Sequence, residues 1–285
     1  MTGKKKVADS PATSANPTEK DEGLKEVLLT VFWAMVIALG FRTVAYEPFN
    51  IPSESMLPTL MIGDYLTVSK WSYGYSRHSA PMSLGGFDGR IFESPVERGD
   101  VAVFKLPRDG KSDFIKRIIG LPGDKIQMRG GVLYINGDAV KRERVPDFAF
   151  KETPNNSCKR YPQYRFMGAD GVADCRYPQY KETLPNGRTY MTLDLNPQGM
   201  GDNTRIYTVP AGHYFGMGDN RDNSLDSRRP SYEGVGYIPA ENMIGRAERL
   251  VVSFNGKARQ WEFWKWWDGL RGARTFTNLK PEEAS

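Results

Sequence analysis

The hydrophobic pattern of the chain begins with one long apolar run near the amino terminus. Residues 27–41 carry no charge, and the weakly charged stretch reaches residue 46 if Arg42 extends its side chain toward an interface. The resulting 20 residues, 27–46, match the length with which a helix crosses a bilayer. The run is apolar on all faces, whereas a helix on a soluble core keeps a polar face. The pattern therefore predicts one N-terminal transmembrane helix over residues 24–46.

A cleaved leader peptide is the alternative interpretation of this run. Ala38-Leu39-Gly40 has the small-x-small form of a cleavage site. The preceding tail is long for a leader, and the cut would fall inside the apolar run. The pattern therefore favours a retained anchor.

The segment before the apolar run has the composition of a disordered tail. Residues 1–23 are rich in Lys, Ser, Pro and Ala, with too few large apolar groups to offset the entropy of ordering. Five lysines precede residue 27. The positive-inside rule therefore places the amino terminus in the cytoplasm and residues 47–285 outside.

Short apolar runs separated by turn signals fill the middle of the chain. The runs lie at residues 101–104, 114–119, 125–128 and 132–135, and the turn signals include Leu121-Pro-Gly-Asp124, Gly130-Gly131 and Asn136-Gly137. This spacing predicts a mainly β domain over residues 47–285, built as an antiparallel β-barrel or sandwich. Residues 141–205 are polar and rich in Pro, Asn and Gly, so we expect an inserted subdomain there.

Charge and composition limit the classes of function. The net charge of +5 suits an anionic membrane surface or a nucleic acid. The basic residues are scattered and no helix-turn-helix, RNP or zinc-finger spacing occurs, so we expect no nucleic-acid partner. Cys158 and Cys175 lack the spacing and the histidines of a metal site, and we expect no metal and no cofactor. The four tryptophans of residues 261–267 fit either interfacial membrane contact or the edge of a core.

A serine in a proline-flanked turn is the first candidate for chemistry. Residues 51–60, directly after the predicted membrane span, contain Ser53 and Ser55 between two prolines. A serine hydroxyl is a weak nucleophile and needs a base beside it. Neither His78 nor His213 has an obvious aspartate to orient its ring, so a histidine-based triad is not expected.

Lysine is the alternative base. Strand alternation places Lys116 on the same face as Phe114 and Ile118, where burial would remove its proton near neutral pH. Arg117, on the opposite face, would need a carboxylate partner. A third segment, residues 218–228, alternates acids, amides and arginines; it fails the EF-hand pattern and is interpreted as a hydrogen-bonded polar loop.

Together these segments resemble the bacterial type I signal peptidases, which are membrane-anchored serine proteases. The resemblance covers the anchor, Pro52–Leu60 with Gly63-Asp64, Arg98–Asp100, Phe114–Asp124, and Gly218–Arg228, in the family order. It implies that Ser55 is the nucleophile, that Lys116 is its general base, and that Ser224 hydrogen-bonds the lysine. It further implies an oxyanion hole made by the Ser53 hydroxyl and the Ser55 backbone N–H, because a developing oxyanion needs donors fixed beforehand.

The resemblance also implies structural and substrate-binding residues. Asp219 with Arg117, and Asp226 with Arg228, would form salt bridges that hold the last block against the strand. The substrate pockets of the family match seven apolar residues here: Phe49, Ile51, Met56, Leu66, Val103, Phe114 and Ile115. Such shallow pockets accept only small side chains at positions −1 and −3 of the substrate.

The function implied is the removal of signal peptides from exported preproteins at the bacterial inner membrane. The partners would be signal peptides and the phospholipid membrane, with the amino terminus cytoplasmic and the catalytic domain periplasmic. Cys158 and Cys175 would then lie in an oxidising compartment, so we predict a disulfide between them.

Two departures and three alternatives accompany the resemblance. Phe114 stands where the family often has Tyr, and Glu54 where it often has a small residue. A pilin or conjugation peptidase of the same fold would have narrower substrates. A LexA-like self-cleaving repressor would need a DNA-binding segment in place of the membrane span. A catalytically inactive binding module is disfavoured, since Ser55, Lys116 and Ser224 are all present.

Overall fold

The computed structural model describes residues 17–44, 46–79, 89–257 and 266–283. The chain forms two units, residues 1–42 and residues 43–285, which are described separately. Residues 261–265 of the Trp-rich stretch lie outside the described residues. The prediction of a membrane contact or core edge falls mostly on them.

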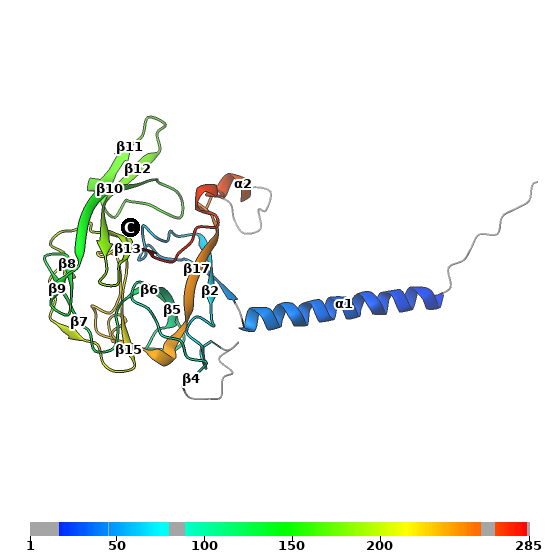
Figure 1. Cartoon of the computed structure of the whole chain (residues 1–285). Helices are drawn as coiled ribbons and strands as arrows, with labels where there is room; N and C mark the ends of the chain where they lie inside the picture. The colour runs from blue at the N-terminus through cyan, green and yellow to red at the C-terminus, as the bar shows by residue number, and fades with distance from the viewer. Residues whose placement is uncertain (1–16, 45, 80–88, 258–265, 284–285) are drawn as a thin grey trace, which may run out of the picture. The chain divides into compact units, whose positions relative to one another are not determined.

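The amino-terminal unit consists of helix α1, Pro17–Val44 (Figure 1). Residues 17–23, predicted as part of the disordered tail, are helical. Pro17 at the first helical position and Glu19 in the first turn favour the start of a helix, and an argument from composition overlooks them. Within the part of the chain that the structure describes, no helix is both long enough and apolar enough to cross a membrane.

Antiparallel sheets make up the second unit, which confirms the mainly β prediction. The main sheet has the order β1-β2-β17-β5-β6-β15-β16, with bounds β1 Tyr46–Asn50, β2 Asp64–Ser69, β5 Val101–Lys105, β6 Asp113–Gly120, β15 His213–Met217, β16 Ile238–Pro239 and β17 Met243–Ser253. The second sheet has the order β14-β7-β8-β9, with bounds β7 Lys125–Arg129, β8 Val132–Ile135, β9 Asp138–Ala139 and β14 Tyr207–Thr208. The four apolar runs predicted as strands are thus strands β5, β6, β7 and β8.

Residues 141–205 build a separate sheet, which stands out from the main sheet in Figure 1. Its order is β10-β12-β13-β18, with β11 on β12, and its bounds are β10 Lys141–Lys151, β11 Arg165–Met167, β12 Ala173–Thr183, β13 Arg188–Leu193 and β18 Glu282–Glu283. A disulfide joins Cys158 to Cys175 within this region, as predicted, and both residues are buried. The remaining short elements are β3 Tyr75–Ser76, β4 Arg90–Ile91, α2 Trp266–Gly269 and the 3₁₀ turns Pro162–Tyr164, Ala240–Asn242 and Gly272–Arg274.

Strand β6 lies where three apolar clusters meet. Ile115 packs against the cluster of β1, β2 and β17, Ile118 belongs to a second cluster, and Ile119 to a third. The alternation predicted for this strand therefore holds, because neighbouring side chains enter different parts of the core.

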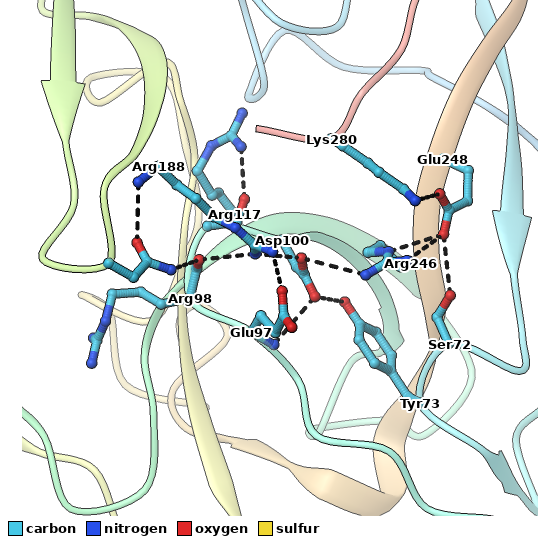
Figure 2. A network of polar contacts seen from close by, with 12 residues as sticks. Ser72, Tyr73, Glu97, Arg98, Asp100, Arg117, Arg188, Arg246, Glu248 and Lys280 are labelled. Atoms are coloured by element: carbon cyan, nitrogen blue, oxygen red, sulfur yellow. Dashed lines mark hydrogen bonds and ion pairs between the residues drawn. The ribbon is translucent and has the colours of Figure 1, made fainter. Parts of the chain in front are cut away.

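A polar network at one end of the main sheet fixes β6 to its neighbours (Figure 2). The Asp100 carboxylate accepts hydrogen bonds from the Tyr73 hydroxyl at 3.0 Å and from Arg188 at 3.1 Å. The adjacent carbonyl of Gly99 accepts one from Arg117 at 2.8 Å. Because Tyr73, Asp100 and Arg117 are buried and paired, the network fixes the position of β6 and of the side chains on it.

Candidate active site

The proline-flanked turn between β1 and β2 holds Ser55. Its backbone is closed by hydrogen bonds from the Leu57 N–H to the Glu54 carbonyl at 3.1 Å and from the Leu60 N–H to the Met56 carbonyl at 2.8 Å. Met56, Leu57 and Leu60 are buried in the core. The turn is therefore anchored by its apolar residues, and Ser55 itself is only 7% exposed.

Lys116 on β6 meets Ser55 across the core. Its ammonium nitrogen Nζ lies 2.8 Å from Ser55 Oγ and 2.8 Å from the carbonyl oxygen of Ile115. The nitrogen also stands 5.6 Å from the centre of the Phe114 ring. Within the described part of the chain, no carboxylate lies in ion-pair contact with this nitrogen.

Burial sets the protonation of Lys116. The residue is 3% exposed, and its desolvation lowers the pKa to about 8, although the charges of Asp226 and Asp219 act in the opposite direction. An ordinary lysine keeps its proton at neutral pH, whereas this one is poised to lose it. The pair can therefore serve as a nucleophile with an adjacent base.

Gly216 on β15 leaves space for the side chain of Lys116, and the sequence did not lead us to predict this role. A Cβ atom at this position would stand 3.1 Å from Lys116 Cβ and 2.9 Å from a methyl group of Ile238. An isolated glycine inside a strand pattern is the signal that could have identified this close approach.

The Ser53 hydroxyl, predicted to form an oxyanion hole with the Ser55 N–H, lies beside the Ser55 hydroxyl. Ser53 is exposed, and its Oγ stands 3.3 Å from Ser55 Oγ. Among the residues that the structure describes, no acceptor is found for the Ser55 N–H. The Ser55 N–H is thus available to a group that arrives at Ser55, while the Ser53 hydroxyl pairs with Ser55 Oγ.

Ser224 is near the pair but does not bond to the lysine. Its hydroxyl is buried and has no hydrogen-bond partner among the described residues, so the predicted Ser224–Lys116 hydrogen bond is absent. A Cβ atom added to Gly218 would stand 2.3 Å from Ser224 Oγ and 2.5 Å from the Ser55 carbonyl oxygen. Ser224 therefore packs against the backbone of Gly218, as the Ser55 carbonyl also does, while Lys116 donates to the Ile115 carbonyl instead.

Both predicted salt bridges form. Arg117 binds Asp219 through two hydrogen bonds, at 2.8 and 2.6 Å. Burial opposes the charge of Arg117, but the charge of Asp219, its hydrogen bonds and the nearby Tyr190 together outweigh burial and raise the arginine pKa. Arg228 binds Asp226 at 2.9 Å and also donates to the Arg221 carbonyl, so this second bridge braces the loop internally and does not reach β6.

Six of the seven predicted substrate-binding residues share one apolar cluster. These are Phe49, Ile51, Met56, Leu66, Val103 and Ile115. Phe114 packs against a different cluster, because it points to the opposite face of β6 from Ile115. It remains beside the site through its contact with the Lys116 ammonium.

The two histidines make their contacts away from Ser55. His213 Nδ1 pairs with the Ala211 carbonyl at 2.9 Å, and His78 lies in the turn after β3.

Three aspartates form a cluster apart from the serine–lysine pair. Carboxylate oxygens of Asp194, Asp202 and Asp222 lie within 4.8 Å of one another. Arg142 binds Asp194 at 2.7 Å and compensates part of this charge.

Comparison with known proteins identifies a family for this chain. Residues 24–252 match the family model described as signal peptidase, peptidase S26. The chain is 36% identical over 281 residues to a protein named signal peptidase I from Rickettsia typhi, covering 92% of this chain and 96% of that protein. It is 37% identical over 258 residues to signal peptidase I from Rickettsia canadensis, covering 87% and 85%. A crystal structure of a signal peptidase I from Enterococcus faecalis V583 is 22% identical, with a TM-score of 0.28, and covers 54% of this chain and 97% of that one.

Proposed function

This chain belongs to the signal peptidase family, peptidase S26, and from that premise we propose that Ser55 and Lys116 cleave signal peptides by acyl-enzyme catalysis. As a member of the family, the chain is a serine peptidase that removes signal peptides. The observation that carries the mechanism is the 2.8 Å contact between the buried Lys116 amine and Ser55 Oγ.

The reaction proceeds in two halves. The neutral amine of Lys116 takes the Ser55 proton as Oγ attacks the carbonyl carbon of substrate residue −1, and the Ser53 hydroxyl and Ser55 N–H bind the resulting oxyanion. The ammonium then gives its proton to the leaving amine, and the signal peptide remains as an ester on Ser55. In the second half, Lys116 takes a proton from water, the hydroxide attacks the ester, and the returned proton regenerates the serine.

Specificity follows from the apolar cluster beside the turn. Ile51, Met56, Leu66 and Val103 are buried and closely packed. A small side chain at position −1 or −3 can lie against such a closely packed cluster, whereas a large one would force the core apart. We therefore expect cleavage after Ala-x-Ala.

The membrane assignment belongs to the same proposal. Large apolar side chains of α1 are exposed, among them Val27, Phe32 and Ile37. Exposed apolar surface of this kind calls for an apolar environment, which supports an anchor in the inner membrane. The disulfide supports an oxidising compartment for the rest of the chain, with residues 47–285 as a periplasmic catalytic domain and residues 141–205 as its insertion.

Cleavage of a model preprotein with an Ala-x-Ala site tests the proposal. Wild type should release the mature protein, and Ser55→Ala and Lys116→Ala should not. His78→Ala and His213→Ala are the matched controls, because they remove the usual type of base without touching Ser55, and both should cleave normally. Failure of wild type to cleave would leave a binding role instead of catalysis.

Amino-terminal sequencing of the mature protein tests the anchor separately. Retention of α1 is expected. A mature chain that begins at Phe41 would mean that the apolar run is a leader peptide.

A further inference from the structure

One asparagine of the 218–228 loop, Asn220, donates hydrogen bonds to the backbone carbonyls of both Glu54 and Ser55. The Asn220 N–H donates to the Ser55 carbonyl at 3.1 Å. The amide nitrogen of its side chain, Nδ2, donates to the Glu54 carbonyl at 3.2 Å. Asn220 is fully buried, so water does not compete for these bonds.

The hydrogen bond to the Glu54 carbonyl also determines the direction of the Ser55 N–H. That carbonyl and the Ser55 N–H belong to one planar trans peptide unit, so they point in opposite directions. Fixing the oxygen toward Asn220 therefore directs the Ser55 N–H away from it. This N–H has no acceptor among the described residues, and it is one of the two proposed donors to the oxyanion.

We propose that Asn220 is a positioning residue that orients the Glu54–Ser55 peptide so that its N–H faces the oxyanion. The inference rests on the proposed function. Rotation of this peptide would withdraw the donor and turn a carbonyl oxygen toward developing negative charge, which would destabilise the transition state.

The surroundings of Asn220 hold its side chain in place. Residues on either side of it are fixed by buried ion pairs, Asp219 with Arg117 and Arg221 with Glu182. The backbone also bridges to Leu193 at the end of β13. The asparagine amide is thus presented to the turn from a rigid support on the inserted sheet.

The buried side-chain amide of Asn220 costs folding free energy that an apolar residue would not. Its oxygen Oδ1 is buried and has no hydrogen-bond partner in the described part of the chain. Leucine, of similar shape, would leave no polar atom unpaired there. The contribution of the amide is therefore the bond that Nδ2 donates to the Glu54 carbonyl.

The turn itself does not depend on that bond. The Leu57 N–H also donates to the Glu54 carbonyl, at 3.1 Å, so the carbonyl keeps a partner when Asn220 is replaced. With one bond to the Glu54 carbonyl in place of two, the peptide should be held less tightly in its orientation while the turn stays folded.

Steady-state cleavage of the model preprotein by Asn220→Leu and Asn220→Ala tests the inference. We expect kcat to fall about 10- to 100-fold, less than complete loss of an oxyanion donor, with KM changed by less than about twofold. The pH midpoint should not move, because Lys116 is untouched. Asn223→Ala is the matched control: its amide donates to the Glu54 carboxylate at 3.2 Å and not to the peptide, and kcat should stay near wild type.

Combination with Ser53→Ala separates positioning from general loosening. If both residues serve one oxyanion, the double variant should lose less than the product of the single losses. If only one of Asn220→Leu and Asn220→Ala keeps the melting temperature of the wild type, that variant alone decides the test. Normal kcat in folded Asn220 variants, an effect on KM alone, a shifted pH midpoint, or losses that multiply with Ser53→Ala would overturn the inference.

The proposed function is judged in the same assay by Ser55→Ala. If that variant still cleaves, the proposed mechanism fails and the inference fails with it. If it is inactive while Asn220→Leu is normal, only the inference fails.

Discussion

Lys116 and Arg117 are neighbours on β6, and both are buried cations that point to opposite faces of the strand. Arg117 is saturated with partners: two hydrogen bonds to Asp219, one to the Gly99 carbonyl, and the Tyr190 ring at 4.4 Å. Lys116 contacts a hydroxyl and a carbonyl, and no carboxylate of the described residues. The same burial therefore yields a permanent charge on one side and a titratable base on the other.

The difference shows what a buried cation needs in order to act as a base. A carboxylate partner repays desolvation and holds the proton, as at Arg117. Without such a partner the desolvation stands, and the pKa of Lys116 falls to about 8. Structural and catalytic roles thus separate across one strand according to the partners on each face.

The largest expected effect follows from removing the base. Lys116→Met should lower kcat/KM by about 10³- to 10⁴-fold, and Lys116→Arg should fail too, because a guanidinium keeps its proton. Lys116→Met should also stabilise the fold at pH 7 by up to about 3 kcal/mol, since wild type must discharge or bury an ammonium. This gain should shrink as the pH rises from about 8 to 10.5, where the unfolded chain loses the same proton. Preprotein cleavage and melting temperature measure both effects, and near-normal cleavage by Lys116→Arg would contradict the assignment.

On the opposite face of β6, removal of the cation should destabilise the fold instead of stabilising it. Arg117→Met leaves Asp219 buried without its cation, so the free energy of unfolding should drop by about 3–5 kcal/mol. Adding Asp219→Leu removes the orphaned charge and should restore much of this loss. Urea unfolding of the full chain in detergent is the measurement. A stable single variant would show that the ion pair contributes little.

The pH profile sharpens the comparison further. Because only neutral Lys116 accepts the Ser55 proton, kcat/KM should rise about tenfold per pH unit below about 8 and level off above it. Arg117→Met, which leaves Asp219 in place, should keep this midpoint, whereas the added Asp219→Leu should lower it, because the Asp219 charge raises the Lys116 pKa. A profile that is flat between pH 6 and 8 would remove Lys116 as the titrating group.

The smallest effect is expected at Ser224. Its hydroxyl does not bond to Lys116 in the structure, so Ser224→Ala should reduce kcat by less than about tenfold and leave the pH midpoint in place. A loss as large as that of Lys116→Ala would mean that Ser224 contacts the lysine during catalysis.

Much of this arrangement could be predicted from the chain itself. Alternation along residues 114–119 separated Lys116 from Arg117, since side chains on a strand point alternately to its two faces. Turn residues and short apolar runs predicted the strands and the antiparallel fold. The proline-flanked turn with Ser55 was identified by its similarity to a family, which also supplied its pairing with the lysine.

Other features depended on contacts that no local pattern encodes. Gly216 opens space for a lysine about a hundred residues earlier in the chain, and Asn220 reaches the Glu54 carbonyl from a different loop. Ser224 turned out to pack against backbone instead of bonding to the amine.

The sequence by itself thus determined the strands, the faces of β6 and the residue types available for chemistry, because these follow from local periodicity and side-chain character. Only the tertiary structure decided that Lys116 would meet Ser55 without a carboxylate while Arg117 would meet Asp219. The physical reason is that a pKa depends on what surrounds a group in three dimensions, and those neighbours come from segments far apart in the chain.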